Sequence, residues 1–139
     1  MSEAAQKNVE LVRSAFEAYA REGPDAAVEM LDPEVEVYSP PALANAGTYH
    51  GVEGYLEWTH GWFDAWQQFE IVPQAIEPVG ESCVIAICRQ RGIGKASGIA
   101  VEQTMTYMWE IRSGKVTRFH LYLSADEARE AARGASSAS

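Results

Sequence analysis

The sequence predicts an α+β fold in which amphipathic helices come first and a long antiparallel sheet comes last. Residues 4–21 repeat apolar side chains at helical intervals. Residues 83–123 are instead rich in β-branched and aromatic side chains, and only the polar, glycine-containing stretches 91–98 and 112–115 interrupt them. This second region is therefore expected to form three antiparallel strands that the rest of the chain covers.

Length and charge limit the classes of function. The 139 residues predict one domain over residues 1–133. The formal net charge of −9 leaves no basic stripe to hold phosphates, so we expect neither nucleic acid nor an anionic membrane as partner. No apolar run is long enough to span a membrane, and residues 1–13 lack the apolar region of a signal peptide. A cytoplasmic protein is expected.

Glycine and proline divide the first part of the chain. Gly23 and Pro24 end the first helix, and a shorter helix follows over residues 25–32. Residues 35–39 predict a short strand that a Pro-Pro pair terminates. Residues 40–51 are small, rich in Pro and Gly and without periodicity, which is typical of a loop.

A third, tryptophan-rich helix is predicted over residues 52–67. Trp58, Trp62 and Trp66 recur every four residues and form one apolar stripe. Such a stripe is more often core than binding site, and both roles stay open here. The chain then continues into a strand that Pro73 interrupts, so this strand is expected at a sheet edge or with a bulge.

Side-chain alternation predicts the pairing of the last two strands. Their odd-numbered residues are mostly apolar or aromatic, so these residues are expected to form the buried face. A three-residue loop at 112–114, with its glycine in the left-handed region, would pair odd residues with odd residues. This pairing sets Met105 near Leu121 and Tyr107 near Phe119.

The C-terminal residues predict a short helix and a tail. Residues 124–127 form a capping box that opens a helix over residues 125–133. Residues 134–139 are small and polar, and we expect this tail to be disordered.

Cysteines and histidines give no sign of a metal site. Cys83 and Cys88 lie five residues apart on one predicted strand, hence on opposite faces, so they cannot form a disulfide with each other. The three histidines show no metal-ligand spacing. Neither a metal nor a cofactor is predicted.

Four segments form a pattern with the first helix: residues 31–38 (LDPEVEVY), 49–58 (YHGVEGYLEW), 89–98 (RQRGIGKASG) and 113–131 (SGKVTRFHLYLSADEAREA). This pattern resembles the nuclear-transport-factor-2-like superfamily, most closely its SnoaL-like proteins. The superfamily also holds ketosteroid isomerase, limonene-epoxide hydrolase and the polyketide cyclases. The resemblance implies a cone-shaped barrel, in which a curved antiparallel sheet wraps around N-terminal helices and encloses an apolar pocket. Because this cone hosts unrelated reactions, the resemblance selects none of them.

The resemblance also places individual residues. It implies that Arg89 and Arg91 point into the cone, where epoxide-hydrolase relatives carry an arginine and an aspartate. Leu121 stands where hydrolase and cyclase relatives carry an essential carboxylate, and Val37 stands where hydrolases carry an active-site tyrosine. Epoxide hydrolysis is therefore disfavoured.

Arg89 and Tyr107 are the candidate catalytic residues. Arg89 could clamp a carboxylate, enolate or carbonyl oxygen of a ligand, or form a structural ion pair with an acid such as Asp64 or Glu102. Tyr107 could donate to a developing oxyanion, or be a core tyrosine bonded to a backbone carbonyl. The candidate ligand-binding residues are Tyr19, Trp58, Trp62, Arg91, Gln103, Met105, Trp109, Phe119 and Leu121.

Two functions from different classes stay open. The first is an enzyme that isomerises or cyclises a small apolar, carbonyl-bearing molecule by proton transfer, for which Asp64 or a histidine would have to supply the base. The second is a non-catalytic module that encloses an apolar ligand. His120 is expected on the convex face as an interface residue, and His60 at the surface.

A homodimer through the convex face of the sheet is also predicted. Ile85 and Ile87 are expected to face the cone, and Val84, Ala86 and Cys88 to face outward. The outer face would then be weakly polar and nearly free of charge, which suits sheet-to-sheet packing. The resemblance points the same way.

Overall fold

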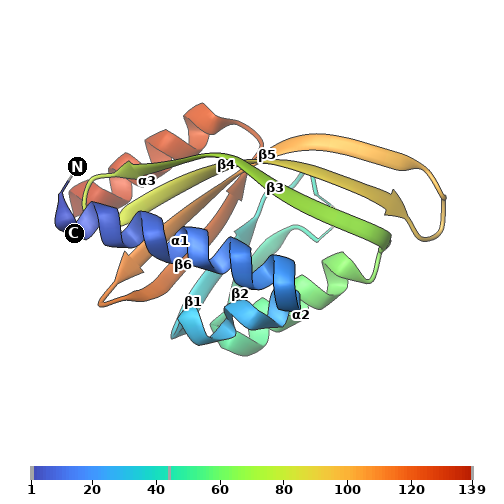
Figure 1. The fold of residues 1–139 in the computed structure, drawn as a ribbon, viewed down its shortest axis with the longest axis horizontal. Coiled ribbons are helices and arrows are strands. Elements are labelled where there is room, and N and C mark those ends of the chain that lie inside the picture. The colour runs from blue at the N-terminus through green and yellow to red at the C-terminus, as the bar shows by residue number, and fades with distance from the viewer. Residues whose placement is uncertain (1, 44, 139) are drawn as a thin grey trace.

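A curved six-stranded sheet with helices on both faces forms the molecule (Figure 1). The computed structural model describes residues 2–43 and 45–138, with side chains up to residue 135. The elements are α1 (Glu3–Glu22), the 3₁₀-helix η1 (Pro24–Met30), β1 (Leu31–Ser39), β2 (Gly47–His50), α2 (Gly51–Phe63), β3 (Trp66–Val79), β4 (Cys83–Gly94), β5 (Ala100–Arg112), β6 (Lys115–Tyr122) and α3 (Ala125–Ala138). The predicted α+β fold is confirmed.

The strands lie in the order β2-β1-β6-β5-β4-β3. Neighbouring strands are antiparallel except β1 and β6, which are parallel. Because β2 and β3 are edges, the curved sheet stays open instead of closing into a barrel. Helices α1 and α2 pack on its concave face, and α3 packs on the convex face. The β4–β5 hairpin extends beyond this body as an arm (Figure 1).

Helix α1 follows the predicted pattern to within one residue at each end. Ser2 caps it, because its Oγ accepts a hydrogen bond of 3.0 Å from the Ala5 backbone N–H. Gly23 ends it with a φ of 89°, a conformation that favours glycine. The buried stripe includes Val9 and Val12 and packs over the concave face of the sheet.

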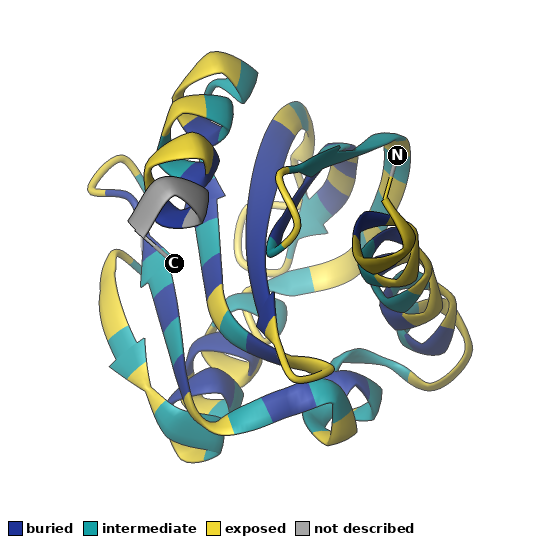
Figure 2. Cartoon of the chain, turned by 90° about the vertical axis from the view of Figure 1, so that its left-hand side faces the viewer, coloured by how far each residue is buried: buried dark blue, intermediate teal, exposed yellow. Residues whose placement is uncertain are grey.

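Strand β4 has the opposite orientation to the predicted one. Val84, Ala86 and Cys88 are buried in the concave core, whereas Cys83 and Ile85 pack beneath α3. Figure 2 shows long buried stretches along the central strands and alternating burial along α1. Because both faces of β4 are covered, its sequence is a nearly continuous apolar run whose alternation does not identify the inner face. The two cysteines form no disulfide with each other and lie on opposite faces, as predicted.

The β5–β6 hairpin pairs odd-numbered residues with odd-numbered residues, as predicted, but its turn differs from the predicted one. Its turn has two residues, Ser113 (φ 52°) and Gly114 (φ 75°), instead of three. A bulge at Thr117 then shifts the pairing, so that Glu110 lies opposite Arg118. The predicted loop is therefore wrong.

The register beyond this bulge also differs from the prediction. Tyr107 lies opposite Leu121, and Trp109 lies opposite Phe119, two residues from the predicted pairs. The rings of Tyr107 and Phe119 still make contact, with centroids 5.2 Å apart. A bulge changes the register without a sequence signal as strong as a glycine turn, which explains the error.

Helix α2 ends earlier than predicted, at Phe63. Trp66 therefore starts β3 and does not extend the helical stripe. Strand β3 is an edge strand with an irregularity between Pro73 and Ala75, as the proline predicts. Trp66 packs against Gly92, where an added Cβ would lie 2.6 Å from the indole.

Helix α3 covers part of the convex face and continues to Ala138, past the predicted end at residue 133. Residues 134–138 are thus helical where a disordered tail is predicted, and residue 139 lies outside the described residues. Cys83, Ile85 and Met108 pack against Ala128 and Ala132 of this helix. The convex face predicted for a homodimer is therefore partly covered by the chain itself.

Candidate functional site

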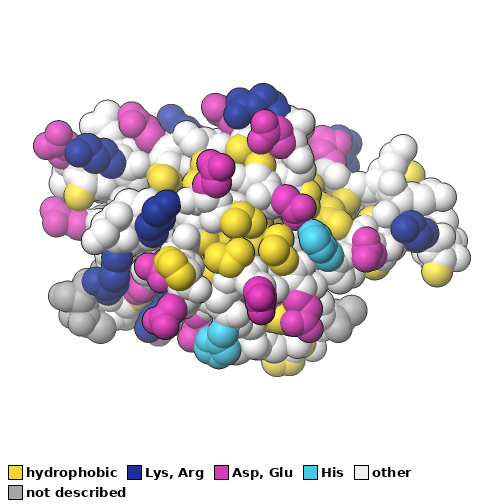
Figure 3. Space-filling model, turned by 90° about the horizontal axis from the view of Figure 1, so that it is seen from below, with side chains coloured by type: hydrophobic (Ala, Val, Ile, Leu, Met, Phe, Trp, Pro, Cys, Tyr) yellow, Lys and Arg dark blue, Asp and Glu magenta, His cyan; other side chains and the backbone are white. Residues whose placement is uncertain are grey.

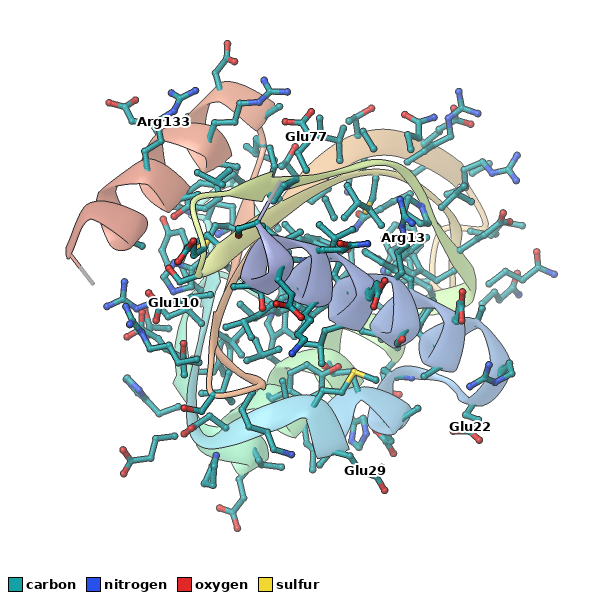
Figure 4. All side chains as sticks on the ribbon, turned by 60° about the vertical axis from the view of Figure 1, so that its left-hand side comes forward. Arg13, Glu22, Glu29, Glu77, Glu110 and Arg133 are labelled. Carbon is teal, nitrogen blue, oxygen red and sulfur yellow. The ribbon has the colours of Figure 1, made fainter. Side chains whose placement is uncertain are left out.

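An apolar cavity of about 60 Å³ lies between α1, η1, α2 and the concave face of the sheet. Side chains fill the space between α1 and the sheet, while the labelled Glu22, Glu29 and Arg133 point away from it (Figure 4). The cavity walls are mostly aromatic and consist of Ala15, Phe16, Tyr19, Pro24, Ala27, Tyr55, Trp58, Thr59, Phe63, Ile71, Tyr107, Trp109 and Phe119.

The ionisable groups of this wall are tyrosines. No Asp, Glu, His, Lys or Arg is among the described residues that line the cavity. Burial, with smaller contributions from Tyr55 and Glu70, raises the pKa of Tyr19 to about 12. Burial also raises the pKa of Tyr55 and holds that of Tyr107 well above its ordinary value. All three phenols therefore stay protonated and neutral at neutral pH.

Tyr107 is held by Gln90, which a second glutamine on the same face of the sheet contacts in turn. Gln103 Nε2 donates to Gln90 Oε1 at 3.2 Å, and Gln90 Nε2 in turn donates to the Tyr107 hydroxyl oxygen. Gln90 is 3% exposed and Tyr107 is 4% exposed. The ring of Tyr107 stacks on Phe16 at 6.3 Å between centroids. The phenol is thus fixed in a buried environment.

Two indole N–H groups of the cavity wall lack partners. Trp58 Nε1 and Trp109 Nε1 are buried, and neither has a hydrogen-bond partner among the described residues. A buried donor without an acceptor is destabilising by about 1–3 kcal/mol, so native proteins rarely keep one without a reason. A ligand with an acceptor atom in the cavity could satisfy these groups.

Half-buried aromatic rings line the cavity at the ends of α1 and α2. Tyr19 and Phe63 make ring contact at 5.7 Å. Beside them, His60 Nε2 lies 2.8 Å from Asp25 Oδ1 and links α2 to η1 at the surface. Figure 3, which views the side that carries α2 and β2, shows hydrophobic side chains gathered at the centre with acidic ones around them. His60 is exposed, as predicted.

Arg89 and Arg91 do not point into the cone, so that prediction is wrong. Their side chains are 49% and 51% exposed, and they lie on the opposite face from Gln90. Arg89 Nε lies 3.2 Å from Glu102 Oε1, and Arg91 Nη2 lies 3.1 Å from Glu70 Oε1. The cause is the orientation of β4, which turns even-numbered residues inward. The ion-pair alternative, with Glu102 as the predicted partner of Arg89, has formed.

The remaining predicted site residues lie in the cavity wall, in the core beside the cavity, or outside both. The predicted wall residues are Tyr19, Trp58, Tyr107, Trp109 and Phe119, and all five line the cavity.

Met105 and Leu121 are buried in the core beside the cavity and do not line it. Gln103 touches Gln90 instead of the cavity. Trp62 packs against Trp66 and Phe69, because α2 ends before its stripe is complete.

Gln90 was not among the predicted site residues. Its role follows only from the inner face of β4, which the sequence leaves ambiguous. Asp64, considered as a base, is the exposed C-cap of α2 and does not line the cavity. His120 lies on the convex side, paired with Glu36 at 2.9 Å. The predicted sources of a base are therefore absent from the cavity wall.

A larger hollow of about 550 Å³ lies on the arm, between β3, β4 and β5. Its wall includes the Arg91–Glu70 pair, together with Phe69, Gly92 and Val101. It opens widely to solvent, and its charged groups already have partners. It therefore lacks the unsatisfied groups found in the cone.

Two further properties concern the described residues as a whole. They contain no group of three or more His, Cys, Asp or Glu side chains able to hold a metal ion. None of their helices is both long and apolar enough to cross a membrane.

Solved structures of similar shape share this fold. Bal32a, from a soil-derived mobile gene cassette, has a TM-score of 0.78 at 19% identity, covering 91% of this chain and 95% of Bal32a. An NTF2-like protein of unknown function from Burkholderia pseudomallei K96243 has a TM-score of 0.76 at 18% sequence identity. The match covers 91% of this chain and 95% of that protein.

A third similar structure is a hypothetical protein with a ketosteroid isomerase-like fold from Catenulispora acidiphila DSM 44928, solved in complex with trimethylamine. Its TM-score is 0.70 at 17% sequence identity, and the match covers 90% of this chain and 92% of that protein. At such identities the similarity establishes the fold alone.

Sequence comparison identifies the family. No curated protein matches the chain. The sequence model of the SnoaL-like domain matches residues 12–119, which is most of the chain. Together with the open, curved sheet around α1 and α2, this match means that the chain belongs to the SnoaL-like domain family and has the NTF2-like cone fold.

Proposed function

We propose that this protein binds a small, neutral, largely apolar molecule that carries a carbonyl group, and that it does so without proton-transfer catalysis. The observation that carries this proposal is the chemistry of the cavity wall. Aromatic rings supply apolar contact, Tyr107, Trp58 and Trp109 supply hydrogen-bond donors, and no carboxylate or imidazole lines the cavity among the described residues.

The absence of a base from this wall favours binding over isomerisation or cyclisation. Both reactions begin by removing a proton from carbon, and the base must lie within hydrogen-bond reach of that proton. The phenols cannot act as bases near neutral pH, because burial raises their pKa values. The Cys88 thiol is equally unsuited, since burial raises its pKa to about 12. The donors alone could bind a carbonyl oxygen.

Ligand entry requires the cone to open. A cavity of about 60 Å³ is smaller than the ligand sites of roughly 300–1,000 Å³ that are usual in proteins. Tyr19 and Phe63 line it at the ends of their helices with their rings in contact, and both side chains are only partly buried. We expect these two rings to move apart when a ligand enters.

The test uses 1-indanone, a neutral bicyclic ketone with exchangeable α-protons. Tryptophan fluorescence should report saturable binding, because Trp58 and Trp109 line the cavity. In deuterated buffer, proton NMR should show α-proton exchange no faster than in protein-free buffer. Absence of saturable binding would refute the proposal. Accelerated exchange would identify a base and favour the isomerase or cyclase alternative.

Homodimerisation stays a separate prediction. Its original basis is corrected, because Val84, Ala86 and Cys88 face the cone and α3 covers part of the convex face. What supports a dimer now is the remainder of that face, where Ile87 and Tyr122 are only partly buried. Light scattering at micromolar concentration should give a dimeric mass, and Ile87→Arg should lower it. A monomeric mass for the unaltered protein would contradict this prediction.

A further inference from the structure

We infer that Gln103 sets the direction of hydrogen bonding in the cavity: through Gln90 it makes Tyr107 a donor to the ligand, so the site selects ketones over alcohols of the same shape. This inference rests on the proposed binding function and names the ligand chemistry of that site. Gln103 acts as a positioning residue, because it touches Gln90 and not the cavity.

Strand pairing brings the two glutamines together. Gln90 of β4 and Gln103 of β5 lie directly opposite each other in the antiparallel register. Gln103 is half-buried at the start of the arm, whereas Gln90 is almost fully buried on the side toward the cone. Gln103 can therefore exchange hydrogen bonds with solvent, while Gln90 depends on its protein neighbours.

The amide of Gln90 has one accepting end and one donating end. Its Oε1 accepts from Gln103 Nε2 at 3.2 Å, so its Nε2 faces the Tyr107 hydroxyl and donates to the phenol oxygen. The hydroxyl hydrogen must then point elsewhere. Among the described residues, none accepts a hydrogen bond from it. Because Tyr107 belongs to the cavity wall, a ligand oxygen is the partner that this hydrogen lacks.

The indole groups of the cavity wall have the same polarity. Trp58 and Trp109 each have an unpartnered buried N–H, and an indole N–H can only donate. A ketone oxygen accepts from such groups and brings no donor of its own. An alcohol of the same shape also brings a hydroxyl hydrogen. At the Tyr107 oxygen this hydrogen competes with the Gln90 amide, which already donates there, and the other hydroxyl oxygens of the wall belong to Tyr19, Tyr55 and Thr59. A ligand hydroxyl that reaches Tyr107 and finds no acceptor there lowers affinity by roughly tenfold or more.

A change of Gln103 to glutamate should reverse the chain of hydrogen bonds. The new carboxylate can only accept, so Gln90 would turn its Nε2 toward it and its Oε1 toward Tyr107. The phenol would then donate to Gln90 and leave its oxygen free to accept from a ligand. The matched control Gln103→Met removes the bond without imposing the opposite direction. Position 103 is half-buried, so both variants should fold, which thermal unfolding verifies.

The experiment measures dissociation constants of 1-indanone and 1-indanol by tryptophan fluorescence. The unaltered protein should bind the ketone about tenfold more tightly. Gln103→Glu should bring the ratio to about one or below, Gln103→Met should give an intermediate ratio, and Tyr107→Phe should also abolish the preference.

The outcomes separate the two proposals. If neither compound binds, the proposed function fails and the inference fails with it. Equal affinities in the unaltered protein would overturn the inference alone. A preference for the ketone that Gln103→Glu leaves unchanged would likewise overturn it.

Discussion

The cavity in the cone and the hollow on the arm are both lined by residues of β3 and β5, yet their chemistry is opposite. Strands β4 and β5 supply Gln90 and Tyr107 to the cone and Arg91 and Glu102 to the arm. Residues 90 and 91 are neighbours, but one is 3% exposed and the other has a side chain that is 51% exposed. Alternation along a strand thus separates a neutral donor site from a charged surface.

The difference shows that size does not identify the site. The arm hollow, at about 550 Å³, is far larger than the cavity, at about 60 Å³. Exposed ion pairs such as Arg91–Glu70 are satisfied by each other and by water, and contribute little energy. The buried indoles of Trp58 and Trp109 have no such alternative. Unsatisfied buried groups are therefore the better indication of a binding site.

The largest expected effect tests the orientation of β4. Ala86→Arg should destabilise the fold by about 3–5 kcal/mol, because Ala86 is fully buried under the concave core and the new charge would lack a partner. Ile87→Arg, on the other face, should cost only about 1 kcal/mol within one subunit, since Ile87 is partly exposed there, and light scattering reports any loss of the proposed dimer separately. Urea unfolding measures both. A larger loss for Ile87→Arg would mean that β4 has the opposite orientation.

The second prediction concerns the junction of the arm with the body. Gly92→Ala should lower the free energy of unfolding by about 1–3 kcal/mol, because the new Cβ would lie 2.6 Å from Trp66 and 3.0 Å from a Phe69 ring carbon. Gly61→Ala is the matched control in α2. No atom lies within 4 Å there, so it should stabilise the protein by about 0.5 kcal/mol. Two equal and small changes would show that Trp66 does not pack against the arm.

The third prediction separates the two regions in binding. Tyr107→Phe should weaken 1-indanone binding about tenfold, because one hydrogen bond to the ligand is lost. Arg91→Met should leave the dissociation constant unchanged and alter stability by no more than about 1 kcal/mol, since its ion pair with Glu70 is exposed. Fluorescence titration and urea unfolding give the two readouts. Weaker binding after Arg91→Met alone would move the site to the arm.

The smallest effect is a dependence of stability on pH that comes from neither region. Burial lowers the pKa of His120 from 6.5, although Glu36 opposes this shift. The folded protein then binds fewer protons than the unfolded chain, so this contribution is present above about pH 6.5 and declines as the pH falls below it.

His120→Gln should flatten the unfolding free energy between pH 7.5 and 5.5. The charged and titratable neighbours of His120 are Glu36, Tyr38, Arg118 and Tyr122, together with the more distant Glu110. If the unfolding free energy of His120→Gln still depends on pH over this range, one of these neighbouring groups takes up the proton instead of His120.

Much of the fold could be predicted from the sequence, because its signals are local. The α1 pattern, the proline irregularity in β3 and the hairpin over residues 91–98 follow from spacing and from glycine or proline chemistry. Five of the predicted wall residues line the cavity, because aromatic residues on the inner faces of α1, α2, β5 and β6 converge.

The orientation of β4 could not be predicted, and the site errors follow from it. Its residues 83–88 are apolar on both faces, since α1 covers one face and α3 the other. Ile85 and Ile87 were expected to face the cone, and the resemblance placed Arg89 and Arg91 on the same face, whereas the even-numbered residues of β4 face it. The bulge at Thr117 is a second long-range feature, because the register of β6 depends on packing against β5 and not on the turn alone.

The four tryptophans offer the most direct measurement, because each region holds two of them. Trp58 and Trp109 line the cavity, whereas Trp62 and Trp66 pack against Phe69 at the base of the arm. Nitrogen-15 NMR of the indole N–H groups, assigned with Trp→Phe variants, should be followed during titration with 1-indanone. Binding in the cone predicts that the Trp58 and Trp109 signals shift and saturate together while those of Trp62 and Trp66 stay in place. Shifts confined to Trp62 and Trp66 would contradict the account and place the ligand on the arm.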